Sequence, residues 1–318
     1  MNKSIVFLSQ MGFSGKVSRD HLNMRVEFAQ MCTLQADHMS LFQLSYERKY
    51  DIAILLIPKT GADRDRLEQI DIISNARQIA DKVLFMQEGP CWIFQDMTVP
   101  QQMWHYNLLN QVDGILTENK TDIPYFKGLN PNIPITDITS LMITDSVEFA
   151  FRIEKQDKII IGGNFVRWYG GFDSFVVARH FELPIYAPSM GRRQPNEEQV
   201  INHLPYMNWR DWIYKLAEFK YAVHLMPTVA AGTFAMNCGY LGIPCIGYGD
   251  LDTQRNIHPF TTVEQNDLET AIKIAQKLKE DKEFYKLCST NSKFNYETHH
   301  SEKVVNKHLN EFFNKLWT

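Results

Sequence analysis

The sequence predicts an α/β protein built from two doubly wound, Rossmann-like domains with a cleft between them. The chain has 318 residues, whereas one domain commonly holds roughly 100 to 200. Short apolar runs alternate with longer amphipathic runs, which is typical of strand–helix units around a parallel sheet. This alternation starts again after the charged stretch RIEKQDK at residues 152–158. We therefore expect an N-terminal domain at residues 1–150, a C-terminal domain at 151–300 and a final helix at 301–318.

The first domain is expected to begin with a buried strand, because residues 4–9 form the apolar run SIVFLS. A turn through Gly12 and Gly15 follows, and Ser18 is placed to cap a helix with apolar side chains along one side. Residues 63–81 carry apolar side chains at helical spacing and predict a second helix. The other expected strands lie at 51–58, 82–86 and 114–117, the other helices at 100–111 and 119–129, and an extended segment at 133–142.

The second domain repeats this pattern. Residues 158–165, KIIIGGNF, predict a strand that runs into a pair of glycines, and residues 171–181 predict the helix that follows. Strands separated by helices again indicate a parallel sheet. The other expected strands lie at 183–187, 221–226 and 243–248, and the other helices at 208–219, 233–241, 268–279, 281–288 and 302–316.

Composition and charge exclude several classes of protein. Hydrophobic residues make up 44% and charged residues 22% of the chain, which is typical of a globular protein and not of a disordered or fibrous one. Lys and Arg number 33 against 37 Asp and Glu, a net charge of −4, so no overall basic field attracts nucleic acid. No apolar run reaches the roughly 18 to 20 residues of a membrane span, and residues 1–10 read as a strand rather than a secretion signal. We therefore expect a cytoplasmic protein.

No metal site is expected. The cysteines are five in number and form no CxxC pair, which argues against a disulfide framework or a zinc site and favours reduced core residues. Two DxD triplets occur, DRD at 63–65 and DLD at 250–252, and such a triplet can hold a divalent cation on a diphosphate. We interpret both as acids near helix starts or in loops, because neighbouring Asp pairs are common by chance. The cysteines are Cys32, Cys91, Cys238, Cys245 and Cys288.

Residues 221–253 contain the most informative pattern, which is a strand, a loop of small residues, a helix beginning at Thr233 and a second strand. The loop ends in Gly232, and Thr228 and Thr233 supply hydroxyl groups on either side of it. Free backbone N–H groups and the helix dipole both favour an anion at such a helix start, so this segment can hold a phosphate. An ordinary capped helix of an α/β domain would have the same sequence, and the residues alone leave both interpretations open.

This segment resembles the donor half of GT-B glycosyltransferases in the loop P-T-x-A-A-G-T, the helix after it and the strand entry LGIPCI. The resemblance implies a nucleotide-sugar donor, with Thr228, Gly232 and Thr233 on its diphosphate. It also implies a last helix that crosses back to the first domain. The chain lacks the carboxylates of the retaining pattern E-x-G-x-x-x-x-E, which favours an inverting enzyme. Sugar or ribose contacts are implied for Asn237, Asp252 and Gln254.

A second stretch, KIIIGGNFVRWYGG at residues 158–171, resembles the G-G-S-F-R segment of the phage DNA β-glucosyltransferase family. The resemblance implies that Gly163, Asn164 and Arg167 meet the donor diphosphate. A glycine turn allows backbone N–H groups to approach phosphate oxygens, and a guanidinium is a planar donor for them. A solvated arginine in a strand–helix loop is the alternative. The arginines of residues 191–193, GRR, form a weaker candidate.

Transfer to a hydroxyl group with inversion requires a general base, and four residues of the first domain are candidates. Glu88 follows the third strand in the segment FMQEGP, where α/β sheets place their ligands. Asp20 and His21 follow the first strand, and Asp96 lies in the loop after Glu88. Each of them could equally be a helix cap or a solvated side chain. We rank Glu88 and Asp20 above Asp96 and His21.

These patterns predict a metal-independent GT-B glycosyltransferase that moves a sugar, with a UDP-sugar as the expected donor, to a hydroxyl group. No cofactor is expected. A glycan or polysaccharide precursor is the expected acceptor. The alternatives are a phage-type DNA glucosyltransferase that acts on hydroxymethylated bases, a nucleotide-sugar epimerase or hydrolase, and a nucleotide-sugar binding protein without activity. The charge of −4 favours a glycan over DNA.

Overall fold

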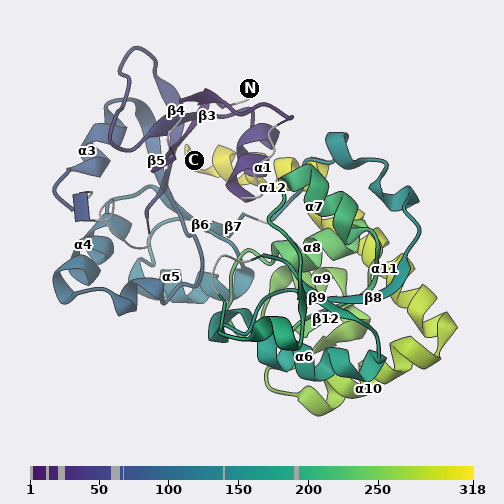
Figure 1. The fold of residues 1–318 in the computed structure, drawn as a ribbon. Coiled ribbons are helices and arrows are strands. Elements are labelled where there is room, and N and C mark those ends of the chain that lie inside the picture. The colour runs from purple at the N-terminus through teal and green to yellow at the C-terminus, as the bar shows by residue number, and fades with distance from the viewer. Residues whose placement is uncertain are drawn as a thin grey trace. The chain divides into compact units, whose positions relative to one another are not determined.

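The computed structural model describes residues 3–11, 14–20, 26–58, 65–66, 68–138, 140–189 and 193–318 (Figure 1). The chain divides into two compact units, and most of the second is Ser140–Ser301. The first unit contains Glu27–Thr139 and also Glu302–Thr318. The division between the units thus lies at residue 139, where the sequence suggested residue 150. Each unit holds one sheet flanked by helices, and the predicted α/β fold with two doubly wound units is confirmed.

The first unit contains a seven-stranded sheet in the order β2-β3-β1-β4-β5-β6-β7. Every pairing is parallel except that between β2 and β3. Its central strands are almost wholly buried because helices cover both faces of the sheet, which explains their continuous apolar sequences. The strands are β1 Ile5–Ser9, β2 Gly15–Lys16, β3 Asp37–Ser40, β4 Tyr50–Leu56, β5 Ala80–Met86, β6 Gly114–Thr117 and β7 Ile135–Asp137, and the helices are α1 Val26–Thr33, α3 Ile72–Arg77, α4 Val99–Leu109, α5 Ile123–Leu129 and α12 Glu302–Lys315.

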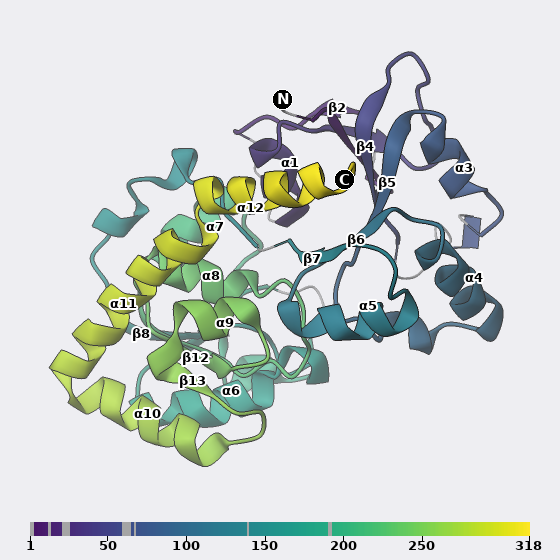
Figure 2. The same cartoon turned by 180° about the vertical axis from the view of Figure 1, so that it is seen from behind.

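The last helix, α12, lies in the first unit beside α1 (Figure 2). The Asn306 side chain donates to the Thr33 carbonyl at 2.9 Å, and Arg19 binds both carboxylate oxygens of Glu302. The apolar side of α12 is buried, including Leu309 and Phe313. This helix therefore completes the core of the first unit although most of the second unit separates it from that unit in the sequence.

The second unit contains a six-stranded sheet in the order β10-β9-β8-β11-β12-β13 with every pairing parallel. Alternate strand residues face two separate cores, one shared with α7, α8 and α9 and the other with α6 and α10, and α11 contributes to both. The strands are β8 Gln156–Ile161, β9 Ile185–Ala187, β10 Asn202–His203, β11 Phe219–His224, β12 Cys245–Tyr248 and β13 Thr262–Val263, and the helices are α6 Gly171–Ala178, α7 Trp209–Leu216, α8 Thr233–Tyr240, α9 Asp252–Ile257, α10 Leu268–Glu280 and α11 Lys282–His300.

Several predicted elements differ from the structure. Over the described residues 68–81 the helix is shorter than expected. It is α3, which begins at Ile72 because the Asp71 carboxylate accepts from the Ser74 N–H at 3.0 Å. The Ser18 hydroxyl, which was expected to cap a helix, accepts from the Asp20 N–H at 3.2 Å, and the start of that expected helix lies at residues 21–25, outside the described residues. The helix expected at 281–288 continues to His300, because Asp281 caps it and no Gly or Pro interrupts it.

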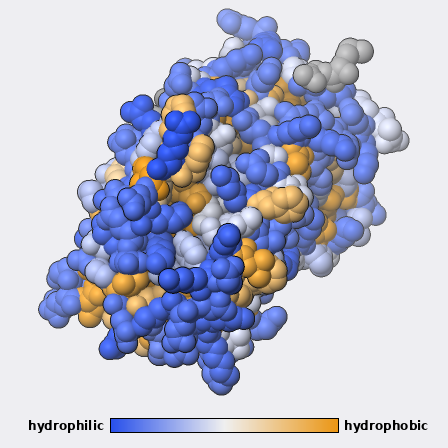
Figure 3. All heavy atoms as spheres, turned by 90° about the vertical axis from the view of Figure 1, so that its right-hand side faces the viewer, coloured by the Kyte–Doolittle hydropathy of each residue, from blue (hydrophilic) through white to orange (hydrophobic). Residues whose placement is uncertain are grey.

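On the face drawn in Figure 3, hydrophobic side chains form separate spots among hydrophilic ones, as is normal for a globular protein. Among the described residues, none of the helices combines the length and the apolar character that crossing a membrane would require.

Candidate functional site

The carboxyl ends of β8, β11 and β12 lie at one edge of the second sheet, because these three strands are parallel neighbours. The Gly162 N–H donates to the Val223 carbonyl at 2.8 Å, which joins the turn after β8 to the end of β11. Gly170, with φ of +64°, packs against the Leu225 carbonyl so closely that a Cβ would overlap it. The two segments that the sequence singled out are therefore neighbours in the structure.

Residues 162–164 of the turn at 162–165 are buried, and the turn is held from two sides. A Cβ on Gly162 would overlap the His224 ring, so only glycine fits there. The Glu197 carboxylate accepts from the Phe165 N–H at 3.0 Å and from the Gln194 N–H at 2.7 Å. The Asn164 side-chain oxygen, Oδ1, accepts from the Val166 N–H at 3.3 Å, and the side-chain nitrogen, Nδ2, has no partner among the described residues. The turn is thus rigid, with Gly163 buried and one amide donor of Asn164 left over.

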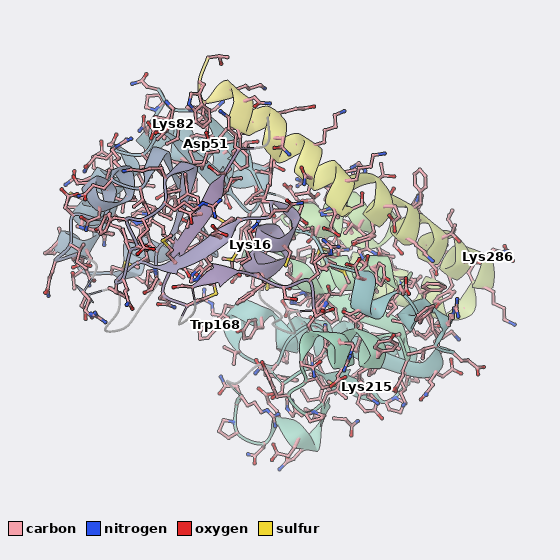
Figure 4. The ribbon with its side chains drawn as sticks, turned by 90° about the horizontal axis from the view of Figure 1, so that it is seen from above. Lys16, Asp51, Lys82, Trp168, Lys215 and Lys286 are labelled. Atoms are coloured by element: carbon pink, nitrogen blue, oxygen red, sulfur yellow. The ribbon has the colours of Figure 1, made fainter. Side chains whose placement is uncertain are left out.

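Arg167 and Trp168 follow this turn in a short 3₁₀ helix and are exposed. Figure 4 labels Trp168, which is 41% exposed. The next helix, α6, begins at Gly171 after the left-handed Gly170. Arg167 is therefore exposed near this sheet edge, and its contact with a donor diphosphate stays a prediction. Of the weaker candidates, Arg193 is exposed and donates to the Ser189 hydroxyl at 3.4 Å, whereas Gly191 and Arg192 lie outside the described residues.

The first turn of α8 has no side-chain cap, and its N-cap is Gly232 with φ of +65°. Thr228 and Thr233 are half-buried on either side of this glycine. The Thr253 hydroxyl packs against the Gly232 Cα, is 3% exposed and has no hydrogen-bond partner among the described residues. Backbone N–H groups and hydroxyls thus gather where the helix dipole is positive, which suits an anion.

Three residues that were expected to meet sugar or ribose take part in internal contacts. The Gln254 amide donates to the Cys245 carbonyl at 2.9 Å, and Asp252 pairs with Arg255 in the first turn of α9. The Asn237 side-chain oxygen accepts from the Trp212 indole N–H at 3.0 Å, and its side-chain nitrogen donates to the Thr233 carbonyl at 3.0 Å. These side chains brace α8 and α9, and their contact with a sugar stays a prediction.

A buried histidine that the sequence analysis did not single out lies at the end of β11. His224 is 6% exposed and packs edge-on against Phe234 at 5.1 Å between ring centroids. Burial lowers its pKa to about 4, so the ring is neutral near pH 7. Neither ring nitrogen has a hydrogen-bond partner among the described residues. A polar residue inside the apolar run YAVHLM was the signal that could have marked it.

In the first unit, the structure joins the loop of Glu88 to a second carboxylate. Glu88 follows β5 and is half-buried, and Glu118 follows β6 and is 6% exposed. The Glu118 carboxylate accepts from the Gly89 N–H at 3.2 Å. Sequence reasoning missed Glu118, because a single Glu between Thr and Asn carries no local motif. Two adjacent parallel strands thus end in a pair of carboxylate-bearing loops.

The other base candidates are placed differently. Asp20 is exposed in a turn with Ser18, and Asp96 is exposed at the end of a 3₁₀ helix, Ile93–Asp96. His21 lies outside the described residues. Of the DxD triplets, Asp65 accepts from the Gln101 amide at 2.9 Å. Across the described part of the chain, no group of three or more His, Cys, Asp or Glu side chains could hold a metal ion.

No protein-family model and no curated protein sequence matches this chain. Solved structures do resemble it. HepE of Anabaena in complex with UDP superposes with a TM-score of 0.70 at 10% identity, over 98% of this chain and 100% of HepE. An α-glucosyltransferase in complex with UDP and DNA containing an HMU base superposes with a TM-score of 0.66 at 11% identity, over 99% and 100%.

A third similar structure is TarM, with a TM-score of 0.60 at 10% identity, over 83% of this chain and 54% of TarM. These structures share the two-unit GT-B architecture. The chain therefore has the GT-B fold that the sequence predicted. At these levels of sequence identity the likeness establishes the fold, and the reaction must be argued from the residues.

Proposed function

We propose that this protein is a glycosyltransferase that moves a sugar from a UDP-sugar to a hydroxyl group of an acceptor. The observation that carries the proposal is the sheet edge of the second unit, where a rigid glycine turn, an exposed arginine and the uncapped start of α8 lie together. The fold is that of solved proteins bound to UDP, UDP-glucose and UDP with glucose. In this proposal Gly163, Asn164 and Arg167 meet the diphosphate from one side.

The start of α8 meets the diphosphate from the other side. Thr228, Gly232 and Thr233 supply hydroxyl and N–H groups to the phosphate oxygens, in an arrangement that needs no reorientation as charge develops. Arg167 stabilises the departing UDP through charge-assisted hydrogen bonds. We propose that these groups replace a divalent cation, so that transfer proceeds without metal. Undiminished turnover in EDTA supports this point, and turnover that requires Mg²⁺ or Mn²⁺ contradicts it.

For the reaction itself, we propose inversion at the anomeric carbon. A carboxylate base takes the proton of the acceptor hydroxyl, whose oxygen attacks the anomeric carbon from the face opposite UDP. The bond between that carbon and the diphosphate oxygen breaks, and its electron pair leaves with UDP. Glu88 is the proposed base, because it follows a central strand of the first sheet. The absence of the retaining motif supports inversion, and an NMR spectrum of the product's anomeric proton tests it.

Binding of the donor can be tested by thermal unfolding with UDP, GDP, ADP, CMP and dTDP at saturation. A ligand at about 100 times its Kd stabilises a protein by about 2.7 kcal/mol. We expect UDP to raise Tm, the variant Arg167→Ala to lose that rise, and Arg210→Ala to keep it, because Arg210 is an exposed arginine of α7 away from the turn. If none of the five nucleotides raises Tm, the donor site is refuted.

For the acceptor, we propose a glycan or polysaccharide precursor, which the net charge of −4 supports. The likeness to the α-glucosyltransferase bound to HMU-containing DNA supports DNA as a second candidate. Retention of the protein on DNA at low salt, with affinity that falls steeply as salt rises, would favour DNA. No retention at low salt removes this candidate.

Two rival functions keep the same donor site. An epimerase or hydrolase would form product from the nucleotide-sugar without any acceptor. A binding protein without activity would bind the nucleotide-sugar through Arg167 and show no turnover. Glu88→Ala and Asp20→Ala would then change no rate. Product formation only when donor and acceptor are both present, and its loss in Glu88→Ala, supports the transferase and contradicts both rivals.

A further inference from the structure

A groove of about 370 Å³ lies between α3 and α4 in the first unit. Its volume is that of a site for a small ligand, since such sites range over roughly 300–1,000 Å³. Two segments form it, residues 68–73 at the start of α3 and residues 104–111 of α4 and the turn after it. None of its lining residues belongs to the strand ends that carry Glu88 and Glu118, so the groove is separate from them.

The side chains of the groove select one class of ligand. Asn107, Gln69 and Gln111 offer amide groups that both donate and accept hydrogen bonds, and Glu68 and Asp71 add carboxylate oxygens. No Lys, Arg or His occurs among the described residues that line the groove, so none of these residues offers a cation to phosphates, nucleotides or acidic sugars. Hydroxyl groups suit amides and carboxylates equally. The ligand this chemistry fits carries many hydroxyl groups and no negative charge.

An aromatic side chain completes the groove. Trp104 is half-buried against the core of the first unit and lines the groove beside Leu108. Indole rings offer a large apolar surface with little conformational freedom to lose. The C–H faces of a pyranose ring can pack on such a surface while its hydroxyl groups reach the amides around it. A nonspecific polar crevice would not combine these two kinds of contact.

The walls of the groove are fixed before any ligand binds. Arg77 of α3 donates to the Gln111 carbonyl at 2.8 Å and to the Asp113 carboxylate at 2.9 Å, which ties α3 to the end of α4. Asp71 is held by the Ser74 N–H and hydroxyl, and these bonds lower its pKa, so it is an acceptor near pH 7. The Gln111 nitrogen donates to the Asn107 carbonyl at 3.1 Å, which leaves the Gln111 side-chain oxygen as an acceptor.

The exposed side of α4 lacks the charges of a helix that lies on a membrane. Residues 97–112 contain no charged side chain. Val99, Met103 and Tyr106 recur at helical spacing on α4 and are 68%, 52% and 43% exposed. Helices that lie on membranes carry Lys and Arg opposite their apolar face, and α4 has neither. This exposed side of α4 therefore does not fit a membrane.

We propose that the groove between α3 and α4 binds a neutral oligosaccharide and holds a distal part of a glycan acceptor. The proposal rests on the proposed function in taking the acceptor to be a glycan. It assigns to the first unit a binding site for neutral glycans in addition to the strand ends at which transfer is proposed. Such a site would favour long acceptors over short ones, because a long chain can contact both places at once.

The test is calorimetric titration of the protein with maltohexaose, cellohexaose and chitohexaose. At least one of these neutral hexasaccharides should bind, with a Kd near or below about 1 mM. Asn107→Arg should weaken that binding at least tenfold, because a long side chain fills an exposed position in the groove. Asn110→Arg is the matched control, since Asn110 is exposed on the same helix but does not line the groove. We expect this control to bind as the unchanged protein does.

Trp104→Ala should abolish binding, and its Tm must be measured because Trp104 also packs on the core. The groove is refuted if none of the three sugars binds, or if Asn107→Arg leaves their binding unchanged. It is also refuted if vesicles of neutral and anionic phospholipid bind and Asn107→Arg removes that binding while no sugar binds. Titration with UDP separates the two proposals. A variant that no longer binds sugar in the groove should still bind UDP. If the protein binds sugar but not UDP, only the transferase proposal is refuted.

Discussion

The strand ends of the two sheets are built from different chemical groups. In the second unit, the candidate donor site consists mostly of backbone, with Gly162, Gly170 and Gly232 at positions where a Cβ would overlap a neighbour. In the first unit, the strand ends carry the side chains of Glu88 and Glu118 instead. The difference teaches that an anion site made of N–H groups leaves glycines in the sequence, whereas a site made of carboxylates does not stand out from the other Asp and Glu residues.

The largest expected effect separates the two carboxylates of the first unit. Glu88→Gln should lower kcat about 10²- to 10⁴-fold, the usual contribution of a general base. It should leave UDP binding unchanged, because the donor site belongs to the second unit. Glu118→Gln keeps an oxygen that can accept from the Gly89 N–H and should cost less. Steady-state rates of both variants measure this, and a greater loss in Glu118→Gln would reassign the base to Glu118.

The second prediction concerns acid stability, which should depend on the second unit. Burial lowers the pKa values of His224 and His258 to about 4, from an ordinary value of about 6.5. Between these values the unfolded chain binds protons that the folded chain does not, so the free energy of unfolding falls as pH falls from about 6.5 to about 4. The slope per histidine is about 1.4 kcal/mol per pH unit.

His224→Phe tests this slope, because Phe retains the packing on Phe234 without a titrating group. In urea unfolding at several pH values, the free energy of unfolding of this variant should depend less steeply on pH, by the contribution of one proton. His299→Gln is the control, because His299 is exposed on α11 and should leave the slope unchanged. An equal slope in the unchanged protein and His224→Phe would mean that His224 is already charged in the folded protein or not buried.

Much of the fold could be predicted from the sequence, because strands buried on both faces are continuous apolar runs. The α3 region shows the limit, since the apolar spacing of residues 63–81 predicts one helix while the Asp71–Ser74 cap starts α3 at Ile72. The strand β3, DHMS, was missed because burial of Asp37 and His38 depends on partners far along the chain, Arg48, Tyr50 and Ser9. The local sequence pattern cannot show that a polar residue is buried when its hydrogen-bond partners come from other segments of the chain.

The same distinction holds for the candidate sites. The glycine turn and the loop before α8 were found because their glycines and threonines form a motif within a few residues. Glu118 and Glu197 were missed because each acts on an N–H group of another segment, Gly89 and Phe165. Asn237 and Gln254 show the converse, since residues at motif positions form contacts inside the unit. Spacing in the sequence shows which residues are near each other in the chain, whereas the hydrogen bonds of the structure show which side-chain atoms are already engaged.

The third prediction tests the glycines of the donor edge. Gly232→Ala places a Cβ against the Thr253 hydroxyl at a backbone φ of +65°, and a left-handed non-glycine residue costs about 1–2 kcal/mol before any overlap. We expect a loss of at least about 2 kcal/mol in the free energy of unfolding and weaker UDP binding. Gly128→Ala is the matched control, because it lies in α5 with open space around its Cα, and it should stabilise slightly. Equal stability of the two variants would contradict the assigned strain.

The smallest expected effect has the opposite dependence on pH and lies in the first unit. His308 of α12 lies 3.5 Å from the Asp137 carboxylate, which raises the pKa of the imidazole by hydrogen bonding and charge. A raised pKa in the folded state stabilises the protein below the ordinary pKa of about 6.5, and this contribution is lost as pH rises through the folded-state pKa. The His308 side chain is 40% exposed, so solvent screening limits the gain to less than about 1 kcal/mol. His308→Gln should therefore destabilise the protein at pH 5.5 more than at pH 8.5 in urea unfolding, and a loss that is larger at pH 8.5 would show that the imidazole stabilises α12 by packing rather than by charge.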